Sequence, residues 1–305
     1  MSIFLWQTGK KRKVIMEKRI LGKTKERLSI IGFGGIVVKN ETARDASKYV
    51  SMSIDRGINY FDVAPEYGNA QETLGPALKP YRDKVFLACK THEMTKKGAE
   101  REFNDSLKKL KTDYFDLYQI HQATTLDEVS QIMGPGGAFE FFIKAKEEGF
   151  VKYLGFTAHS EEAAIALMDI YDFTSILFPF NWALWFKDDF GPAVFKKAKE
   201  KGIGILALKA LAKGAWKKNE KINWNKCWYA PTDSFEEASL ALRFTLSLPV
   251  TSVVSPSHAE LLWLACDIAD SFKPISPEEK EVLKDKSQSI VSLLQELKIP
   301  YQISS

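Results

Sequence analysis

Four polar side chains follow closely on strand-like runs, and their types suit proton transfer to a carbonyl oxygen. Asp62, Lys90 and His121 end the runs INYFD, KVFLACK and YFDLYQIH, and Tyr67 follows within FDVAPEYG. A phenol can deliver a proton, but its usual pKa of about 10 is too high for easy exchange at neutral pH. A nearby ammonium group favours the phenolate and lowers that pKa.

These types predict a division of roles. Tyr67 would supply the proton, Lys90 the cation, and Asp62 would pair with Lys90 and fix its position. His121 would donate a hydrogen bond to the substrate oxygen as negative charge develops there. Each residue alone also has an ordinary structural explanation, such as a turn cap, an ion pair, loop packing or a core histidine. The combination favours an oxidoreductase that acts on carbonyl compounds.

The elements that must position these residues follow a repeating pattern. A charged helix end, a glycine and an apolar strand recur at Gly57, Gly149 and Gly202, as expected where a helix ends and a strand begins. Candidate strands start near residues 29, 58, 85, 115, 152, 175, 204 and 251, and amphipathic segments lie between them. Regular alternation implies parallel strands with right-handed crossovers. We therefore predict an α/β fold, a (β/α)8 TIM barrel.

Amphipathic residues predict helices over 43–56, 99–111 and 138–148. The sequence Ser-Pro-Glu-Glu at 276–279 predicts a capping box that opens a last helix, which we expect to reach about Leu297.

A short hairpin is predicted over residues 18–29, where it would cap the base of the barrel. The main alternative is a doubly wound open sheet, but IGFGG (31–35) lacks the G-x-G-x-x-G that would open a helix after the first strand. In a barrel the strand ends converge on one rim, which would bring the four candidate residues together.

Length and charge limit the classes of function. The 305 residues with 45% hydrophobic content suit one large domain, over 18–305, preceded by a solvated or disordered basic lead-in at 1–17. KKRKV (10–14) superficially matches a nuclear-import patch, and Met16 is a second candidate start. The net charge of +4 gives no reason to expect nucleic acid or membrane partners, and no apolar run reaches the ~20 residues of a membrane span.

The cysteine count indicates a reducing compartment, so we expect a cytoplasmic protein. Cys89, Cys227 and Cys266 form no closely spaced pairs, and an odd count argues against a disulfide framework. Three cysteines also exclude a four-cysteine metal or iron–sulfur site within this chain. Cys89 should face away from Lys90, as a packed thiol.

Over roughly residues 18–260 the sequence resembles the aldo-keto reductase family. FDVAPEYG resembles the family's signature around its catalytic Asp and Tyr, RDKVFLACK the strand with the catalytic Lys, and SLKKLKTDYFDLYQIH the run ending in the catalytic His. The resemblance implies a (β/α)8 barrel and NAD(P)H-dependent reduction of a small aldehyde or ketone, with Tyr67 as general acid and no metal. It assigns Asp62, Lys90 and His121 the roles given above.

The resemblance also implies cofactor contacts. In YLGFTAHS (153–160), the hydroxyl of Thr157 would hold the nicotinamide amide. Ala158 stands at the position of the family's usual Asn and cannot make its side-chain hydrogen bond. His159 is the candidate substitute. FPFNW (178–182) retains Asn181, with Leu177 in place of the usual Gln. The remaining candidates are Lys209, Leu211 and Lys213 in the loop over the pyrophosphate, and Ser255 and Ser257 after the eighth strand.

The family resemblance favours NADP(H) over NAD(H). The segment SPSHAELLWLACD (255–267), however, has no Arg or Lys for a 2′-phosphate, which predicts that NADPH binds less than ~10-fold better than NADH. The altered cofactor contacts leave a second hypothesis, a cofactor-binding sensor or regulatory barrel with little turnover. A third, a nucleic-acid binder, depends on KKRKV alone. The sequence assigns no oligomeric state.

Overall fold

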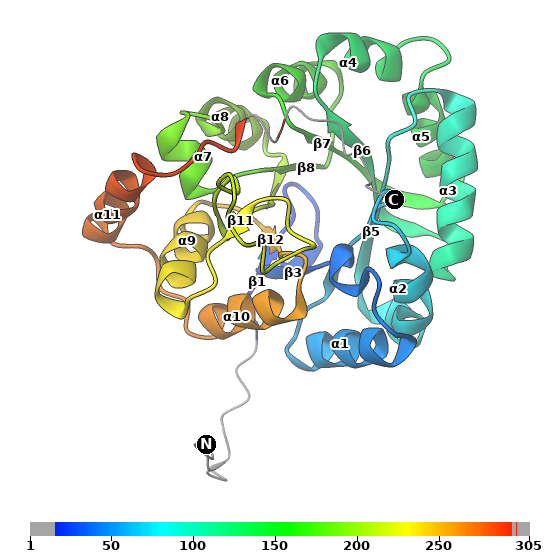
Figure 1. Cartoon of the computed structure of the whole chain (residues 1–305). Coiled ribbons are helices and arrows are strands. Elements are labelled where there is room, and N and C mark those ends of the chain that lie inside the picture. The colour runs from blue at the N-terminus through cyan, green and yellow to red at the C-terminus, as the bar shows by residue number, and fades with distance from the viewer. Residues whose placement is uncertain (1–15, 295–296, 298–305) are drawn as a thin grey trace.

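The predicted (β/α)8 barrel is confirmed. The structure is a computed structural model that describes residues 16–294 and residue 297. Eight parallel strands follow one another around the barrel in chain order, and the last pairs with both the first and the seventh (Figure 1). The barrel strands are β3 (Ile31–Gly34), β4 (Tyr60–Asp62), β5 (Phe86–Thr91), β6 (Phe115–Ala123), β7 (Val151–Ala158), β8 (Ser175–Phe178), β9 (Gly204–Ala207) and β12 (Ser252–Val254).

Helices surround the barrel (Figure 1). They are α1 (Ala43–Asp55), α2 (Ala70–Leu78), α3 (Lys96–Leu110), α4 (Leu126–Met133), α5 (Ala138–Glu147), α6 (Glu161–Ile170), α7 (Trp182–Lys187), α8 (Pro192–Lys201), α9 (Phe235–Ser247), α10 (Ala259–Ala269) and α11 (Pro277–Ser287), with 3-10 turns η1 (Gly35–Val38) and η2 (Lys79–Lys84). The three amphipathic helices expected from the sequence correspond to α1, α3 and α5. Across the described part of the chain, no helix combines the length and apolar character needed to cross a membrane.

The last helix begins as predicted but ends early. Ser276 and Glu279 form the expected capping box, in which each side chain accepts a hydrogen bond from the other residue's backbone N–H. The helix then ends at Ser287, ten residues before the expected Leu297. Just after the helix, the carbonyl of Gln288 accepts a hydrogen bond of 3.0 Å from Lys187 on α7.

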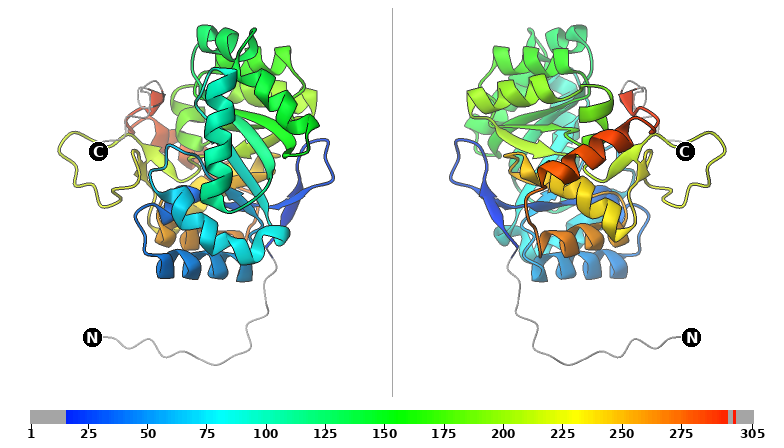
Figure 2. Two further views of the ribbon diagram at one scale, coloured as in Figure 1. Left: turned by 90° about the vertical axis from the view of Figure 1, so that its right-hand side faces the viewer. Right: turned by 90° about the vertical axis from the view of Figure 1, so that its left-hand side faces the viewer.

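A two-stranded hairpin closes the base of the barrel, as predicted. β1 (Lys18–Ile20) pairs antiparallel with β2 (Arg27–Ser29), and Leu21 and Leu28 are buried with the side chains of the barrel interior. Met16 is also buried, so the folded chain includes the residues just before the hairpin. Figure 2 shows the hairpin in blue at one end of the barrel and the yellow-green segment between β10 and β11 at the other.

That segment folds across the mouth of the barrel. It connects β10 (Ala212–Gly214) to β11 (Ala230–Pro231), which pair with each other. Lys226 ties it to the opposite rim: its Nζ donates to the carbonyl of Val37 at 3.1 Å and to Glu41 Oε1 at 2.5 Å. The mouth is therefore partly covered by a chain segment from outside the barrel strands.

A buried polar network fixes η2 and β5 against β6. Asp116 Oδ2 accepts hydrogen bonds from Arg82 Nη1 at 2.9 Å and from the backbone N–H of Leu87 at 3.0 Å. Its other oxygen pairs with Lys152 Nζ at 2.7 Å. Arg82 is 9% exposed, so its charge depends on Asp116 for compensation.

We expect Asp116→Ala to lower the free energy of unfolding by ~3–5 kcal/mol, because it leaves the Arg82 charge buried without its partner. Urea denaturation monitored by circular dichroism measures this change. The exposed Asp113 offers a matched control, for which the same substitution should cost less than ~0.5 kcal/mol. Equal losses in the two variants would contradict the importance of the network.

Candidate active site

A buried ion pair lies at the carboxyl ends of β4 and β5. Asp62 ends β4, and Lys90 Nζ donates to its Oδ1; each residue is 1% exposed. Asp62 Oδ2 accepts two further hydrogen bonds, from the Tyr60 hydroxyl and from Gln119 Nε2, each at 3.1 Å. Burial is the largest single effect on the pKa of Lys90 and would lower it, but the charges of Asp62 and Tyr67 and the hydrogen bond to Asp62 together raise this pKa above its usual value. Lys90 is therefore a permanent cation.

Tyr67 lies between this ion pair and His121. It comes from the loop after β4, and Lys90 Nζ is 5.3 Å from the centroid of its ring. The ring of Tyr67 meets the ring of His121 edge-on, with centroids 6.1 Å apart. The four side chains predicted from the sequence thus come together at one end of the barrel.

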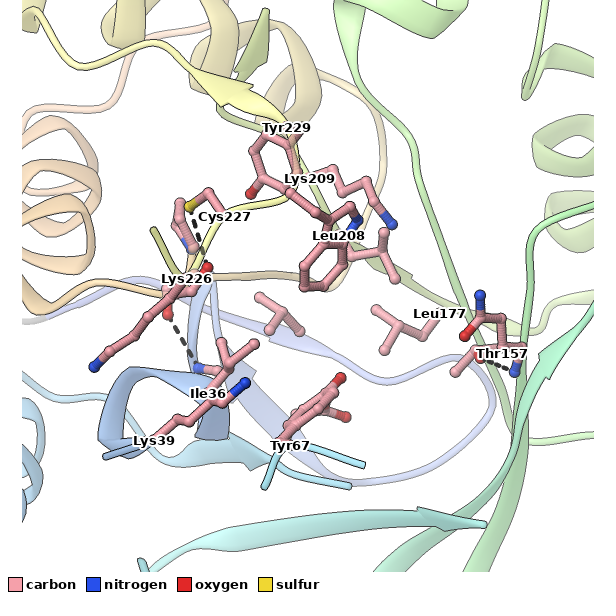
Figure 3. Close-up of a pocket in the computed structure, with 18 of the residues that line it drawn as sticks. Ile36, Lys39, Tyr67, Thr157, Leu177, Leu208, Lys209, Lys226, Cys227 and Tyr229 are labelled. Carbon is pink, nitrogen blue, oxygen red and sulfur yellow. Dashed lines mark hydrogen bonds between the residues drawn. The ribbon is translucent and has the colours of Figure 1, made fainter. Parts of the chain in front are cut away.

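They line a cavity of about 430 Å³ at the barrel mouth (Figure 3). Figure 3 shows Tyr67 on one side of the cavity, with Lys209 and Tyr229 across from it. Leu177 and Leu208 give an apolar wall, and the segment between β10 and β11 adds aromatic rings. The cavity is therefore mostly apolar, with a few polar groups gathered at the strand ends, as is common for small-molecule sites.

Five of the eight predicted cofactor-binding residues also line this cavity: Thr157, His159, Lys209, Ser255 and Ser257. The hydroxyl of Thr157 accepts a hydrogen bond of 2.6 Å from the backbone N–H of Gln122, and that of Ser255 accepts one of 3.0 Å from Gly34. Ser257 Oγ is 3.1 Å from Cys227 Sγ.

The other three candidates are not among the residues that line the cavity. Asn181 is fully buried, and its side-chain oxygen caps α7 by accepting from the N–H of Leu184 at 3.0 Å. Leu211 is buried, and its carbonyl accepts from the N–H of Thr232 at 2.7 Å. Lys213 borders a separate hollow beside α11. Asn181 and Leu211 thus make contacts within the fold, and Lys213 lies away from the other candidates.

Lys209 is a buried amine without a carboxylate beside it. It is 6% exposed, and burial lowers its pKa to about 7. Its Nζ lies 3.3 Å from His159 Nε2 and 5.3 Å from the centroid of the Trp228 ring. The ion pairs among the described residues include none to Lys209. An anion bound in the cavity would compensate the positive charge of Lys209.

His121 contacts a carboxylate that the sequence interpretation missed. It lies on β6 within an irregularity in the pairing with β7, between Ile120 and Ala123, and its Nδ1 is 3.0 Å from Glu66 Oε2. The ring of His92 meets that of His121 edge-on at 4.2 Å between centroids. Burial lowers the pKa of His121 well below its usual value, and the charges of His92 and Lys90 add to this effect. The sequence feature that could have indicated this contact is Glu66 itself, a carboxylate directly before Tyr67.

Glu66, His92 and His121 also bring one potential metal ligand each to within 4.8 Å of one another. The hydrogen bond between Glu66 and His121 accounts for the closest of these approaches without a cation. We therefore interpret Glu66 and His121 as a hydrogen-bonded pair, with the ring of His92 packed against His121.

Comparison with known proteins identifies a family. The family model described as "Aldo/keto reductase family" matches residues 30–279. The uncharacterized oxidoreductase YqkF of Bacillus subtilis strain 168 is 28% identical over 213 residues, which is 65% of this chain and 66% of that protein. The aldo-keto reductase YhdN of the same strain is 28% identical over 195 residues, which is 59% of this chain and 56% of that protein. This chain spans about half to two thirds of such relatives.

Solved structures share the fold. The aldo-keto reductase AKR11C1 from Bacillus halodurans, in its holo form, superposes with a TM-score of 0.72. The match covers 93% of this chain and 100% of that one, at 22% sequence identity.

We expect Asp62→Asn to destabilise the fold by ~3–5 kcal/mol, because the buried Lys90 charge loses its compensation. Lys90→Met leaves Asp62 uncompensated and should cost a similar amount. The double variant should lose less than the sum of the two, with a coupling of ~0.5–3 kcal/mol in a denaturant-based mutant cycle. Strictly additive losses would show that the pair does not act as a unit.

Proposed function

The chain belongs to the aldo/keto reductase family, and on this premise we propose that its cavity is the active site of an NAD(P)H-dependent oxidoreductase that reduces an aldehyde or ketone to an alcohol. The observation that supports this most directly is the buried Lys90–Asp62 pair next to Tyr67 at the cavity. A phenol beside a permanent cation suits proton transfer to a carbonyl oxygen. The substrate is expected to be a small molecule, since the cavity holds about 430 Å³.

The residues present suit a nicotinamide dinucleotide. Lys209 is a buried amine that lacks a carboxylate, and the pyrophosphate of the cofactor would supply the missing negative charge. Thr157 and His159 offer polar groups for the nicotinamide amide, and Ser255 and Ser257 offer hydroxyls at the end of β12. When bound, the cofactor supplies the hydride for the carbonyl carbon. From the family resemblance we infer NADP(H) more readily than NAD(H).

Within this proposal, side chains of the protein deliver the proton to the substrate. Tyr67 donates its hydroxyl proton to the carbonyl oxygen as negative charge develops on that oxygen. Lys90 stabilises the phenolate that remains, and Asp62 holds Lys90 in position. His121 borders the same region of the cavity, where its second ring nitrogen can contact the substrate oxygen. The three free and buried cysteines support the expectation that the protein acts in the cytoplasm.

A cofactor-binding sensor with little turnover is the second candidate. It is favoured by the cofactor side of the site. There Asn181 caps a helix, and Leu177, which stands in place of the family's usual Gln, forms an apolar wall with Leu208. Turnover measurements with an aldehyde panel separate the two candidates, because a sensor would bind cofactor and show little reduction.

Tyr67→Phe tests the general acid. Loss of the phenol proton should lower turnover by a factor of ~10²–10⁴, because that is the usual contribution of a positioned acid. Cofactor affinity, measured by fluorescence quenching, should stay close to that of the unmodified protein. Reduction of aldehydes at an unchanged rate in the Phe variant would refute the role of Tyr67.

The lowered pKa of Lys209 leads us to expect that cofactor affinity depends on pH. Binding of an anion favours the protonated amine, whose pKa in the free protein is about 7. Above pH 7 binding must therefore take up a proton, and the dissociation constant for NADH should rise by up to ~10-fold per pH unit, whereas below pH 7 it should level off. NADH is the suitable probe because its pyrophosphate does not titrate in this range.

Lys209→Met should bind NADH more weakly and with little dependence on pH. Lys213→Met is the matched control, because Lys213 lies outside the cavity and should leave the pH dependence in place. A Lys209→Met variant that keeps the full slope would show that another group titrates.

Discrimination between the two dinucleotides should be weak. Selection of the 2′-phosphate usually needs an Arg or Lys close by, and residues 255–267 contain neither. We expect NADPH to bind less than ~10-fold better than NADH, a difference below ~1.4 kcal/mol. Both dissociation constants should be measured at one ionic strength. A preference above a hundredfold would mean that a basic residue elsewhere in the chain completes the site.

A further inference from the structure

Lys39 is a further lysine of the cavity that has no carboxylate partner. It follows η1, lines the cavity and is half-buried. Of the other lysines in the cavity wall, Lys90 pairs with Asp62 and Lys226 pairs with Glu41, whereas no ion pair of the described residues includes Lys39. An ammonium group that is partly removed from water is stabilised by an anion that can reach it. Lys39 therefore offers a bound molecule an uncompensated positive charge.

Two contacts hold Lys39 beside the proton donor. The backbone N–H of Asn40 donates a hydrogen bond of 2.8 Å to Asn69 Oδ1, which ties the end of η1 to the loop that contains Tyr67. The side chain of Lys39 crosses over Gly68, where an added Cβ would lie 3.3 Å from Cε of Lys39. Figure 3 shows Lys39 extending toward Tyr67. Its ammonium thus lies on the side of the cavity where a carbonyl would be reduced.

The wall of the cavity carries more positive than negative charge. The described residues that line it include four lysines and a single carboxylate, Asp62, which already compensates Lys90. In the proposed function the pyrophosphate of the cofactor compensates Lys209, which Figure 3 shows across the cavity from Tyr67. The positive charge of Lys39 is then left for the other molecule in the reaction, which is the substrate.

The chemistry of this group narrows the kind of anion. An ammonium is a compact point charge that suits a single carboxylate. Proteins commonly bind phosphate groups with an Arg fork or with several N–H groups at a helix N-terminus. The described residues that line the cavity include no arginine. These features favour a carboxylate over a phosphate.

We propose that Lys39 binds an anionic group of the substrate, and that this site reduces an aldehyde or ketone that also carries a carboxylate. The inference rests on the function proposed above, because it places the carbonyl oxygen at the Tyr67 hydroxyl. The carboxylate, at the other end of the substrate, pairs with the ammonium of Lys39. Ile36, which lines the cavity next to Lys39, contacts the apolar carbons between the two groups.

Pairs of substrates that differ in charge test this proposal. The semialdehydes of succinic, glutaric and adipic acid vary the distance between carbonyl and carboxylate, and the methyl ester of each removes the charge. We expect kcat/KM for at least one acid to exceed that for its ester by ~5–50-fold, as for a hydrogen bond between charged groups that water partly screens. The preference should fall as the salt concentration rises. Equal values for acid and ester throughout the series would refute the proposal.

Two substitutions at Lys39 locate the preference. Lys39→Met keeps the length of the side chain and removes its charge, so the ratio of the two kcat/KM values should fall to about one. Lys39→Arg keeps the charge and should retain a preference for the acid. The ratio is insensitive to a general loss of folding or turnover, because such a loss affects both substrates equally. A Lys39→Met variant that keeps the preference would show that another cation binds the carboxylate and would overturn the assignment.

Lys218→Met is the matched control. Lys218 is exposed in the segment between β10 and β11 and does not line the cavity, so this variant makes the same change of net charge outside the site. It should leave the ratio for acid and ester as it is in the unmodified protein. The dissociation constant for NADH distinguishes a cofactor role from a substrate role. Weaker NADH binding in Lys39→Met, with equal effects on acid and ester, would assign Lys39 to the cofactor and contradict the proposal.

Binding without turnover separates failure of this inference from failure of the proposed function. The corresponding ω-hydroxy acids and their neutral amides can be titrated calorimetrically into the full-length protein in the presence of NADH. We expect a hydroxy acid to bind more tightly than its amide, by a factor that Lys39→Met abolishes. A protein that shows this difference but reduces none of the aldehydes would contradict the proposed function and leave the anion site intact. Reduction of acids and esters at equal rates would contradict the inference alone.

Discussion

The pairing of Lys90 with Asp62 is the interaction on which the site depends. A buried ammonium keeps its charge when an opposite charge and hydrogen bonds replace water. The groups of this network come from neighbouring strands. Lys90 on β5 donates to Asp62 on β4, and Asp62 also accepts a hydrogen bond from Gln119 on β6. Lys90 lies opposite Gln119 in the register of β5 and β6. A shift of one residue in this register would turn these side chains to the other face of the sheet. The strand register of the barrel therefore also determines whether the ion pair can form.

The two buried lysines of the cavity show how surroundings set the chemistry of one residue type. Lys90 has a carboxylate partner, and its pKa lies above the usual value. Lys209 has a histidine and an aromatic ring beside it, and its pKa falls to about 7. In the proposed function the first would be the fixed cation beside the proton donor, whereas the second would gain its charge when an anion binds. The two lysines therefore make two electrostatically different regions of the cavity.

Local patterns explain which predictions succeeded. Glycines after charged helix ends marked the junctions at Gly57, Gly149 and Gly202, and each has the positive φ that such a junction requires. Strand alternation gave the opposite orientation of Cys89 and Lys90, and Cys89 is indeed a buried free thiol. The predicted end of α11 was wrong: the helix ends at Ser287, and the carbonyl of Gln288 that follows contacts Lys187 on α7. Local sequence holds no record of that contact.

The sequence by itself determined the eight-stranded barrel and the identity of the four proton-transfer candidates, because periodicity, glycine junctions and motif spacing are local properties. Tertiary structure decided their partners. Asn181 became a helix cap, Lys209 became a buried amine with a lowered pKa, and Glu66 came to face His121 across 55 positions of sequence. Burial and the direction of a hydrogen bond depend on which side chains meet in space, and that is settled when the barrel closes.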